Sequence, residues 1–478
     1  MVENLKIYNT LSGKKETFKP LKNKKVNMFV CGPTVYDFSH IGHARNYIFF
    51  DFLVKYLKLR FGYKVFYLQN ITNIDDKIIL RAKEKGVSPE DLAKAFEKEY
   101  LSDMKALGIT SVSKYARATD YIKEIISQIK RLRDNGHAYI IHDGIYFDIA
   151  TFGRYGKLSN RTVLQAEDSM SRIDYSKNKK NRGDFCLFKF SEGHEGEPIW
   201  KSPWGDGRPG WHIEDTAITE KVFGSQYDVH GGARDLIFPH HEAEIAQMES
   251  LGGKRPMAKY WMHSGFLTTD GQKMSKSLNN FITVKDFLRR YSKEEVRFWF
   301  AKSLWRSPLN YTESTMIEVK SALQKIEEFL SKIHPVKYRK AVILPKAKLF
   351  DQVKKIKVNF YENLADDFNT PKAFAAIFDF IKELNKLLGE SSIDKKSCDE
   401  ILKFFKEIND IFGIINFKRI SRLNIPDEVK KLAEEREICR KSQDWAKADE
   451  IRKEIEKYGY SVEDTKDGPL IKKLDARS

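Results

Sequence analysis

Two histidines three residues apart follow a short apolar segment near the start of the chain. The segment Val26–Cys31 reads as a buried strand, and it leads through a Gly/Pro turn into His40-Ile41-Gly42-His43. Ligands of open α/β sheets bind at the carboxyl ends of the strands, where a helix N-terminus offers free N–H groups. The two imidazoles would complete a phosphate cradle, and Gly42 would let a flat base approach the backbone. The pattern predicts a phosphate-binding turn.

A second cationic segment lies far downstream. The run KMSKS at residues 273–277 follows Gly271 and carries two ammonium groups spaced to grip a polyphosphate. A short Lys/Ser loop alone is more often a solvated turn, and a lone His-Ile-Gly-His is rarely functional. Because the two segments occur together and in this order, we interpret them as parts of one polyphosphate site.

The elements that must position these segments alternate between strands and helices. Val26–Cys31, an amphipathic stretch to about Arg60 and the apolar run Lys64–Gln69 form a βαβ unit. Further helix and strand signals follow at Pro89–Leu107, Ala118–Asn135, Tyr139–Phe147, Asp184–Phe190, Tyr227–His230 and from about Pro239. The polar segment 171–183 reads as an exposed loop within an insertion. This order predicts an α/β sheet interrupted by an insertion.

After about Tyr291 the strand signals stop. Charged segments with an apolar stripe predict a helical bundle, and they are Glu313–Ile333, Leu349–Leu364 and Lys372–Leu388. A charged helix pair over Asp427–Tyr458 and a hairpin at Asp467-Gly468 would form a last, smaller module.

Charge and composition limit the class of protein. Lys and Arg number 84 against 67 Asp and Glu, a net charge of +17 that would attract a polyanion such as RNA, although a Lys-rich solvated surface explains the charge equally well. No stretch approaches the ~18 apolar residues of a membrane helix, and Met1–Thr10 lack the apolar core of a signal peptide. We therefore expect a cytoplasmic protein with no membrane partner. The four widely spaced cysteines exclude a disulfide framework, and they are Cys31, Cys186, Cys398 and Cys439.

The two cationic segments together resemble the signature sequences of class I aminoacyl-tRNA synthetases. Four more segments are similar to cysteinyl-tRNA synthetases in particular: NITNIDDK at 70–77, GRPGWHIE at 207–214, DVHGGARDLIFPHHEAEIAQ at 228–247 and DDFNTPKA at 366–373. The resemblance extends from about Asn9 to Leu470. It implies a ligase that activates L-cysteine with ATP to cysteinyl-adenylate and pyrophosphate, and then transfers cysteine to the terminal adenosine of tRNA(Cys). We expect it to be a monomer.

The family also implies the architecture: a Rossmann-like class I catalytic domain with an insertion, an all-helical bundle and a small C-terminal anticodon-binding module. The expected boundaries are 1–110 for the first half of the catalytic domain, 111–200 for the insertion, 201–310 for the second half with the KMSKS loop, 311–420 for the bundle and 421–478 for the last module. In that module cations alternate with an aromatic residue, at Arg436, Arg440, Lys441, Trp445, Lys447 and Arg452. Bases could stack on Trp445, but an amphipathic helix with Trp445 packed inward fits as well, so we assign RNA binding to the module only.

The resemblance assigns roles at the nucleotide site. His40 and His43 would contact the triphosphate, and Lys276, helped by Lys273, would stabilise the charge that develops as pyrophosphate leaves with Mg²⁺. The other implied ATP contacts are Gly32, Thr34, Gly42 and Ser277, with the Gly231-Gly232 turn and Asp235 near the adenosine. The reaction needs no general base, because the substrate carboxylate is already ionised, so catalysis is positioning and charge stabilisation.

The resemblance also implies a zinc site that separates cysteine from serine. An apolar pocket discriminates such near-isosteres by only ~10- to 200-fold, whereas Zn²⁺ prefers a thiolate to a hydroxyl. The family's metal positions fall on Cys31, His240, Glu244 and Asp215, and the family has cysteine where this chain has Asp215. His240 and Glu244 face the same way on a helix. Asp215 either binds the ion as a harder ligand or leaves the site weak or free of zinc.

Four residues would surround the substrate cysteine. Cys31 and Thr72 would lie beside it, while Trp211 and His230 resemble residues that close over the amino acid. Outside this context, Trp211 would read as a core residue and His230 as part of a polar turn.

Three other functions fit parts of the pattern. A cysteine ligase of the mycothiol pathway would lack the full anticodon-binding end, and an idle RNA-binding paralogue would have a broken phosphate motif. A generic nucleotidyltransferase would lack the PHHEAE and GWHIE segments.

Overall fold

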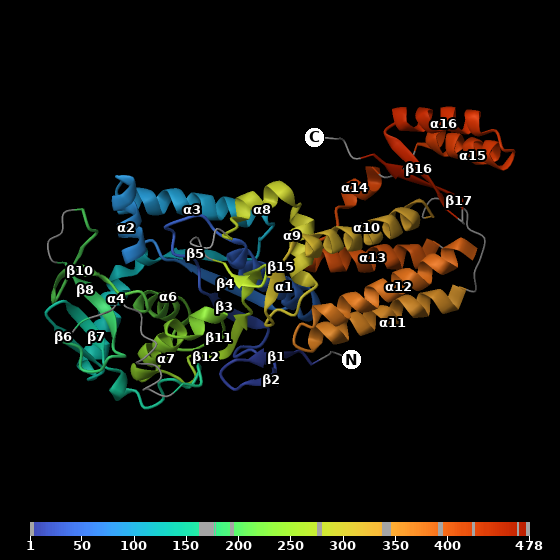
Figure 1. Ribbon diagram of the computed structural model, residues 1–478. Helices are drawn as coiled ribbons and strands as arrows, with labels where there is room; N and C mark the ends of the chain where they lie inside the picture. Colours follow the sequence, from blue (N-terminus) through green and yellow to red (C-terminus); the bar gives the residue numbers. More distant parts are fainter. Residues whose placement is uncertain are drawn as a thin grey trace. The chain divides into compact units, whose positions relative to one another are not determined.

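The computed structural model describes residues 4–161, 176, 178–191, 196–274, 280–336, 346–390, 395–422, 426–465 and 468–474. The chain divides into two compact units (Figure 1). The first unit contains Met1–Ile317, Tyr361–Ala373 and Asp410–Gly413. The second contains Glu318–Phe360, Phe374–Asn409 and Ile414–Ser478.

A five-stranded parallel sheet forms the centre of the first unit. Its strands lie in the order β12-β11-β3-β4-β5, and every neighbouring pair is parallel. The strands are β3 (Lys25–Val30), β4 (Lys64–Ile71), β5 (Lys114–Arg117), β11 (Tyr227–Ala233) and β12 (Ala258–Ser264). The chain passes from β3 outward to β4 and β5, then returns to β11 on the other side of β3. The carboxyl ends of β3 and β11 are therefore the switch point at which open α/β sheets bind ligands.

Helices connect these strands, and apolar burial explains their positions. They are α1 (Ile41–Phe61), α2 (Asp76–Lys85), α3 (Pro89–Ala106), α6 (Ile213–Phe223) and α7 (His240–Ser250). α1 ends at Gly62, which adopts the left-handed conformation (φ 64°) and donates its N–H to Lys58 O (3.2 Å), while the N–H of Tyr63 donates to Leu57 O (3.3 Å). Met28, Phe29 and Val30 on β3 are consecutive and fully buried, as expected for a parallel strand covered on both faces. The predicted α/β fold is confirmed.

The insertion is built on an antiparallel sheet with the order β6-β7-β8-β10-β9. Its strands are β6 (Ala138–Ile141), β7 (Gly144–Phe147), β8 (Phe185–Phe190), β9 (Trp200–Ser202) and β10 (Gly205–Pro209). Before it come η1 (Ala118–Tyr121) and α4 (Ile122–Asp134), and η2 (Ile149–Thr151) follows β7. Within the range 111–200 expected for the insertion, β5 belongs to the central sheet, whereas β10 of the insertion sheet lies beyond residue 200. Of the expected loop 171–183, residues 171–175 and 177 lie outside the described residues, and the described part, 176 and 178–183, contains no helix or strand.

Short elements complete the first unit. A hairpin of β1 (Lys6–Asn9) and β2 (Lys14–Thr17) begins the chain, and β13 (Leu267–Thr269), β14 (Gln272–Lys273) and β15 (Leu309–Tyr311) form a small sheet. The remaining helices here are η4 (Arg234–Ile237), α8 (Val284–Arg290) and α9 (Lys293–Ala301). The buried guanidinium of Arg45 on α1 donates to the carbonyls of Gly265 (2.9 Å) and Phe266 (2.6 Å). α1 is thereby fixed to the loop that precedes β13.

A second buried guanidinium collects carbonyl groups from distant parts of the sequence. Arg297 on α9 donates to Phe412 O (2.6 Å), Leu107 O (3.0 Å) and the Asp51 carboxylate (2.7 Å). Arg297 and Asp51 are 1% and 0% exposed. The segment Asp410–Gly413 is thus held inside the first unit although it comes more than a hundred residues later.

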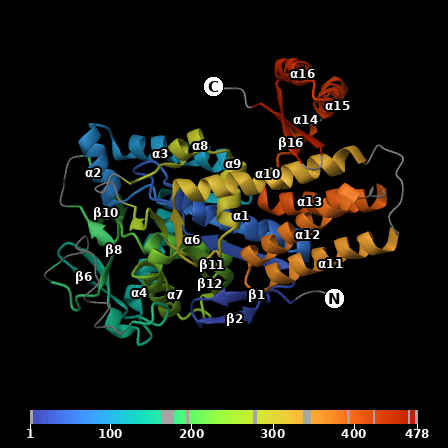
Figure 2. The ribbon, with the colours of Figure 1, turned by 45° about the vertical axis from the view of Figure 1, so that its right-hand side comes forward.

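Four long helices follow and run side by side in both views (Figures 1 and 2). They are α10 (Glu313–Val336), α11 (Lys346–Ala365), α12 (Thr370–Glu390) and α13 (Lys395–Phe412), with the short α14 (Phe417–Arg422) after them. Phe329 packs against Phe380 and Phe405, with ring centroids 6.1 and 5.6 Å apart. The predicted helical bundle is confirmed.

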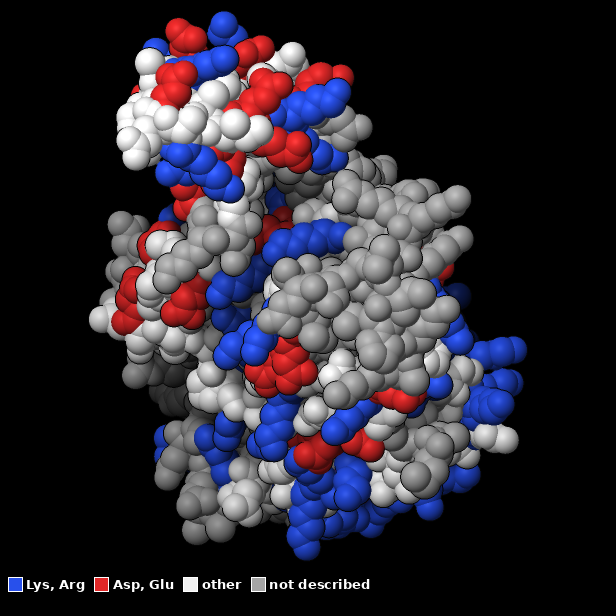
Figure 3. All heavy atoms as spheres, turned by 90° about the vertical axis from the view of Figure 1, so that its right-hand side faces the viewer, with Lys and Arg blue, Asp and Glu red and all other residues white. Residues whose placement is uncertain are grey.

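The C-terminal module consists of α15 (Asp427–Lys441), α16 (Trp445–Lys457) and the antiparallel pair β16 (Tyr460–Thr465) and β17 (Gly468–Lys473). Its own small core contains Val429, Ala433, Ile451, Ile455, Tyr460 and Val462. The predicted hairpin is present, although Asp467 lies outside the described residues. The surface of this module carries both signs of charge in close alternation (Figure 3, top). Among the helices described, none is long and apolar enough to cross a membrane.

Candidate functional site

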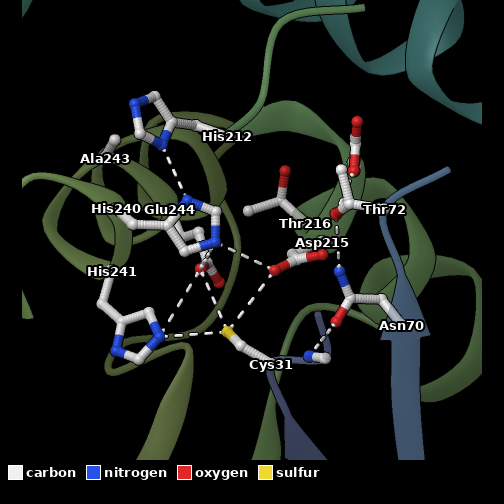
Figure 4. A network of polar contacts seen from close by, with 12 residues as sticks. Cys31, Asn70, Thr72, His212, Asp215, Thr216, His240, His241, Ala243 and Glu244 are labelled. Carbon is white, nitrogen blue, oxygen red and sulfur yellow. Dashed lines mark hydrogen bonds and ion pairs between the residues drawn. The ribbon is translucent and has the colours of Figure 1, made fainter. Parts of the chain in front are cut away.

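Residues from three distant segments meet beyond the carboxyl end of β3. Cys31 directly follows β3, Asp215 lies in the first turn of α6, and His240 and Glu244 lie one turn apart on α7 (Figure 4). The Cys31 Sγ is 3.4 Å from Asp215 Oδ2 and 3.9 Å from Glu244 Oε1. The His240 Nε2 is 3.0 Å from Asp215 Oδ2 and 3.2 Å from Glu244 Oε1. The ligands of a tetrahedral zinc ion lie about 3.3–3.8 Å apart, given bonds of ~2.0–2.3 Å, so these four atoms could share one ion.

α7 supplies an unusual number of buried polar groups. All its residues from His240 to Ser250 are buried, so each ionisable side chain needs a partner inside the protein. Glu242 has one, because it accepts the backbone N–H of Ser159 (2.8 Å). Glu249 accepts the N–H of Met257 (3.3 Å). The other ionisable groups of this helix, on its remaining face, point into the cluster with Cys31 (Figure 4).

Two further histidines reach the same thiol. The His241 Nε2 is 3.0 Å from Cys31 Sγ, and the His230 Nε2 is 3.5 Å from it. His230 belongs to β11, where the sequence predicted it beside the substrate, but His241 was missed as a cluster residue. Its spacing of three from Glu244 places both on one face of α7, and that signal could have found it.

The carboxyl groups of the cluster are under-satisfied. Glu214 Oε1, Asp215 Oδ1 and Glu244 Oε2 are buried and accept no hydrogen bond from any part of the chain that the structure describes. Burial, followed by the Asp215 charge, raises the pKa of Glu244 well above its usual range. Burial and the charges of Glu244 and Asp215 likewise raise the pKa of the Cys31 thiol. A bound divalent cation would reverse these shifts, so the donor set fits a metal ion.

The residues predicted around the substrate cysteine border this cluster. Trp211 is 36% exposed and stacks on the His240 ring, with centroids 4.2 Å apart and an interplanar angle of 21°. It is therefore a wall of the cluster and not a core residue. His230 is fully buried and stacks on Trp261 (4.2 Å). The Thr72 hydroxyl donates to Glu214 Oε2 (2.9 Å), which links it to the neighbour of Asp215.

The predicted phosphate-binding turn opens α1. His40 is the N-cap, and its Nδ1 accepts the N–H of Gly42 (3.1 Å). The rings of His40 and His43 stack with centroids 3.8 Å apart. Burial lowers the pKa of His40 to about 4, and burial together with the His40 charge lowers the pKa of His43 well below its ordinary value. At neutral pH both rings are uncharged, so they can offer phosphate a hydrogen bond but no positive charge.

Two glycines of this region are required by close contacts. A Cβ on Gly32 would lie 1.8 Å from the carbonyl oxygen of Asn70, whose side chain accepts the Gly32 N–H (2.5 Å). A Cβ on Gly42 would lie 2.8 Å from the His40 ring, so Gly42 makes room for the capping imidazole. Next to Gly32, the partly exposed Thr34 forms a parallel bridge with Thr72. The loops after β3 and β4 are therefore paired at the site.

The prediction of a Gly231-Gly232 turn is wrong, because both residues lie within β11. Their lack of a side chain serves packing: a Cβ on Gly231 would lie 2.3 Å from the Phe50 ring, and one on Gly232 would lie 2.8 Å from the His241 ring. Asp235 is exposed in η4, just after the end of this strand.

The described residues on either side of 275–279 border the same turn. Lys273 closes β14, and Met274 Cε is 3.5 Å from the position that a Cβ of Gly42 would take. On the far side of the segment, Ile282 O accepts the N–H of Ile41 (3.1 Å). The side chain of Lys273, and Ser275, Lys276 and Ser277, lie outside the described residues. Met274 and Ile282, which flank the rest of the loop, therefore lie beside the phosphate-binding turn.

In the C-terminal module the structure separates the candidate RNA residues. Arg436 is 5% exposed and donates to both carboxylate oxygens of Asp464 (2.6 and 3.2 Å), so it is a structural residue. Trp445 is 58% exposed, with the guanidinium of Arg440 6.0 Å from its ring centroid. The alternative in which Trp445 packs inward is wrong.

Family comparisons cover most of the chain. Residues 17–321 match the family described as "tRNA synthetases class I (C) catalytic domain", residues 359–416 match the DALR domain, and residues 424–469 match the "Cysteinyl-tRNA ligase anticodon binding domain". A cysteine–tRNA ligase of Thermococcus gammatolerans is 42% identical over 98% of this chain and 99% of its own length. A cysteine–tRNA ligase of Methanococcus maripaludis (strain C7) is 43% identical over 98% of this chain and 100% of its own length.

Solved structures share the fold at low sequence identity. A Mycobacterium tuberculosis methionyl-tRNA synthetase in complex with methionyl-adenylate has a TM-score of 0.62 and 16% identity, covering 81% of this chain and 92% of its own. The LeuRS of Agrobacterium radiobacter K84, in a ternary complex, has a TM-score of 0.63 and 11% identity, covering 83% and 85%.

Proposed function

The chain belongs to the cysteine–tRNA ligase family, and from this premise we propose how its residues carry out the reaction. The enzyme is a ligase that activates L-cysteine with ATP, forming cysteinyl-adenylate and pyrophosphate. It then joins cysteine to the terminal adenosine of tRNA(Cys) for protein synthesis. The observation that carries the proposal is the buried Cys31 cluster at the carboxyl end of β3, from which the chain continues to the phosphate-binding turn that opens α1.

In the adenylation step the substrate carboxylate attacks the α-phosphate of ATP, and the chain binds and orients both substrates. His40 and His43 donate hydrogen bonds to the triphosphate as neutral rings. Lys276, helped by Lys273, would stabilise the negative charge that develops on the pyrophosphate as it leaves with Mg²⁺. The other ATP contacts in this proposal are Gly32, Thr34, Gly42, Gly231, Gly232, Asp235 and Ser277.

For the metal we propose one Zn²⁺ held by Cys31, Asp215, His240 and Glu244. When bound, this ion would accept the substrate thiolate and thereby favour cysteine over serine. The unsatisfied, buried carboxyl oxygens of Asp215 and Glu244 support the assignment. Trp211 and His230 would close over the amino acid, with Thr72 behind them. Asp215 keeps the charge of the cysteine found elsewhere in the family, but it is a harder ligand.

The proposal also covers the domain boundaries, the oligomeric state and the cellular location of the protein. We keep the boundaries 1–110, 111–200, 201–310, 311–420 and 421–478 as a functional division. Light scattering would test the proposed monomer, and cell fractionation would test the cytoplasmic location.

The matches over residues 359–416 and 424–469 favour tRNA as the acceptor over the amino sugar of the mycothiol pathway, since that ligase lacks the full anticodon-binding end.

The test is cysteine-dependent ATP–pyrophosphate exchange, with serine as competitor, on protein whose zinc content is measured in the same sample. We expect exchange with cysteine and one zinc per chain. Exchange in protein that contains no zinc would support the ligase activity and contradict the proposed metal site. An absence of exchange would favour the idle paralogue, and tRNA binding without aminoacylation would then be expected.

A further inference from the structure

We propose that His241 is a metal ligand in this chain and that, together with His230, it completes a second donor set around Cys31 and Glu244. The inference rests on the proposed metal site. It differs from that proposal in the donors that hold the ion and in the role left to Asp215.

Two overlapping groups of four donors occur in the cluster. One is Cys31, Asp215, His240 and Glu244, and the other is Cys31, His230, His241 and Glu244. In each group all donor atoms lie within 4.8 Å of one another. In the second group the His241 Nε2 and His230 Nε2 lie 3.0 and 3.5 Å from Cys31 Sγ, and His230 Nε2 is 3.5 Å from Glu244 Oε2. Both groups therefore have spacings suited to one ion.

All three histidines of these groups are oriented in the same way. Each points its Nε2 at the cluster while its Nδ1 has a partner outside: Tyr227 OH for His230 (2.7 Å), His212 Nδ1 for His240 (2.8 Å) and His263 Nε2 for His241 (2.7 Å). A metal-bound imidazole characteristically uses its other nitrogen in this way, which fixes the tautomer and the ring. His241 is thus positioned as a ligand as fully as His240 is.

The support for His241 extends through a second ring. The His263 Nδ1 is 2.8 Å from the Thr10 hydroxyl, so a consistent chain runs from His241 Nδ1–H to His263 Nε2 and from His263 Nδ1–H to Thr10. In this arrangement the Nε2 lone pair of His241 is directed at Cys31. Gly232 is part of the arrangement, because any side chain there would meet the His241 ring.

Charge distinguishes the two groups. The first contains a thiolate and two carboxylates, so a divalent ion within it carries a net charge of about −1. The second contains one thiolate and one carboxylate, which gives a net charge of about zero. An incoming substrate thiolate is repelled less by the second group. An ion held by His230 and His241 would therefore bind the substrate thiolate more readily. Because this second group does not include residue 215, aspartate at that position does not prevent metal binding.

The experiment measures zinc per chain, after dialysis against a competing chelator, in the wild type and in Asp215→Ala, His241→Ala and the double variant. If the two groups overlap as proposed, each single variant retains zinc and the double variant binds it at least tenfold more weakly than either. Complete loss of zinc in Asp215→Ala, together with unchanged zinc binding in His241→Ala, would overturn this inference. That result would leave the proposed metal site of the previous subsection intact. A wild type without zinc would overturn it together with the proposed site.

Cobalt substitution gives a second readout that does not depend on activity. In His241→Ala the thiolate-to-cobalt charge-transfer band should persist, because Cys31 remains, while the d–d bands should shift with the loss of a nitrogen ligand. Unchanged d–d bands would contradict the proposal. His137→Ala, which removes a histidine of the insertion, is the matched control, and circular dichroism of every variant separates metal loss from unfolding.

Discussion

The phosphate-binding turn at His40 and the metal cluster around Cys31 both begin at the end of β3, yet they are built in opposite ways. In the turn, the functional rings come from one short segment and are held by their own backbone, since His40 caps the helix that it begins. In the cluster, the donors come from the residue after β3 and from α6, β11 and α7, and each depends on packing between elements. A contiguous segment can specify an anion site, whereas this cation site exists only in the folded sheet.

The two regions also differ in charge. The described part of the turn contains uncharged imidazoles and backbone N–H groups, while the cluster buries three carboxyl groups and a thiol with few donors to satisfy them. Neutral donors suit a polyanion that arrives with its own Mg²⁺. Buried acids suit a cation held by the protein itself.

The largest expected effect separates the two regions directly. Lys276→Ala should reduce ATP–pyrophosphate exchange by roughly 10²- to 10³-fold, because a charge that stabilises the leaving group is lost. Zinc content and tRNA binding should remain unchanged, since the cluster and the C-terminal module do not involve this residue. Lys254→Ala, an exposed lysine elsewhere in the first unit, is the control. Unchanged exchange would refute the role of Lys276.

A smaller effect tests whether the cluster depends on residues behind its ligands. In the His241→Ala background, where the second donor group is incomplete, His212→Ala removes the partner of His240 Nδ1 and should weaken zinc binding by about tenfold, as loss of such outer partners does in other metal sites. Chelator competition measures the change, and His137→Ala controls for the loss of a histidine. An unaltered zinc affinity would show that the ligands hold the ion without the hydrogen bond between His212 and His240. The cluster would then resemble the phosphate-binding turn, whose rings are held by their own segment.

The smallest effect concerns the turn and its pH dependence. Burial lowers the pKa of His40 to about 4, so the unfolded chain binds more protons than the folded chain between pH 6.5 and 4. The stability contributed by neutral His40 is present above pH 6.5 and is lost as the pH falls through this window. His40→Asn keeps a good N-cap and removes the titration, so its thermal midpoint should fall less on acidification than that of the wild type. Parallel curves would show that His40 titrates normally.

The sequence predicted what depends on short-range pattern. The buried run at Val26–Cys31, the helix after it and the spacing of His240 and Glu244 could be identified because each is a local property of the chain. Trp211 and His230 were placed through resemblance, and the structure brings both to the cluster.

What the sequence could not predict depends on contacts between distant elements. Gly231 and Gly232 read as a turn because glycine is frequent in turns, but Phe50 and His241 require them within a strand. Arg436 was grouped with the cations of the C-terminal module, and no sequence pattern reveals that it pairs with Asp464. The position of β5 in the central sheet, inside the expected insertion range, follows from its pairing with β4.

The buried Arg297 has a consequence for how the enzyme is made. Its partner Phe412 O is synthesised more than a hundred residues after it, and Tyr361–Ala373 also belongs to the first unit. The ribosome synthesises the chain in N-to-C order, so the first unit cannot complete its folding when only residues 1–317 have been translated. Until the end of α13 emerges, Arg297 lacks its partner at Phe412. Maturation of the catalytic unit thus waits for the bundle, and a chain truncated before Phe412 should be a poor folder rather than a free-standing adenylating enzyme.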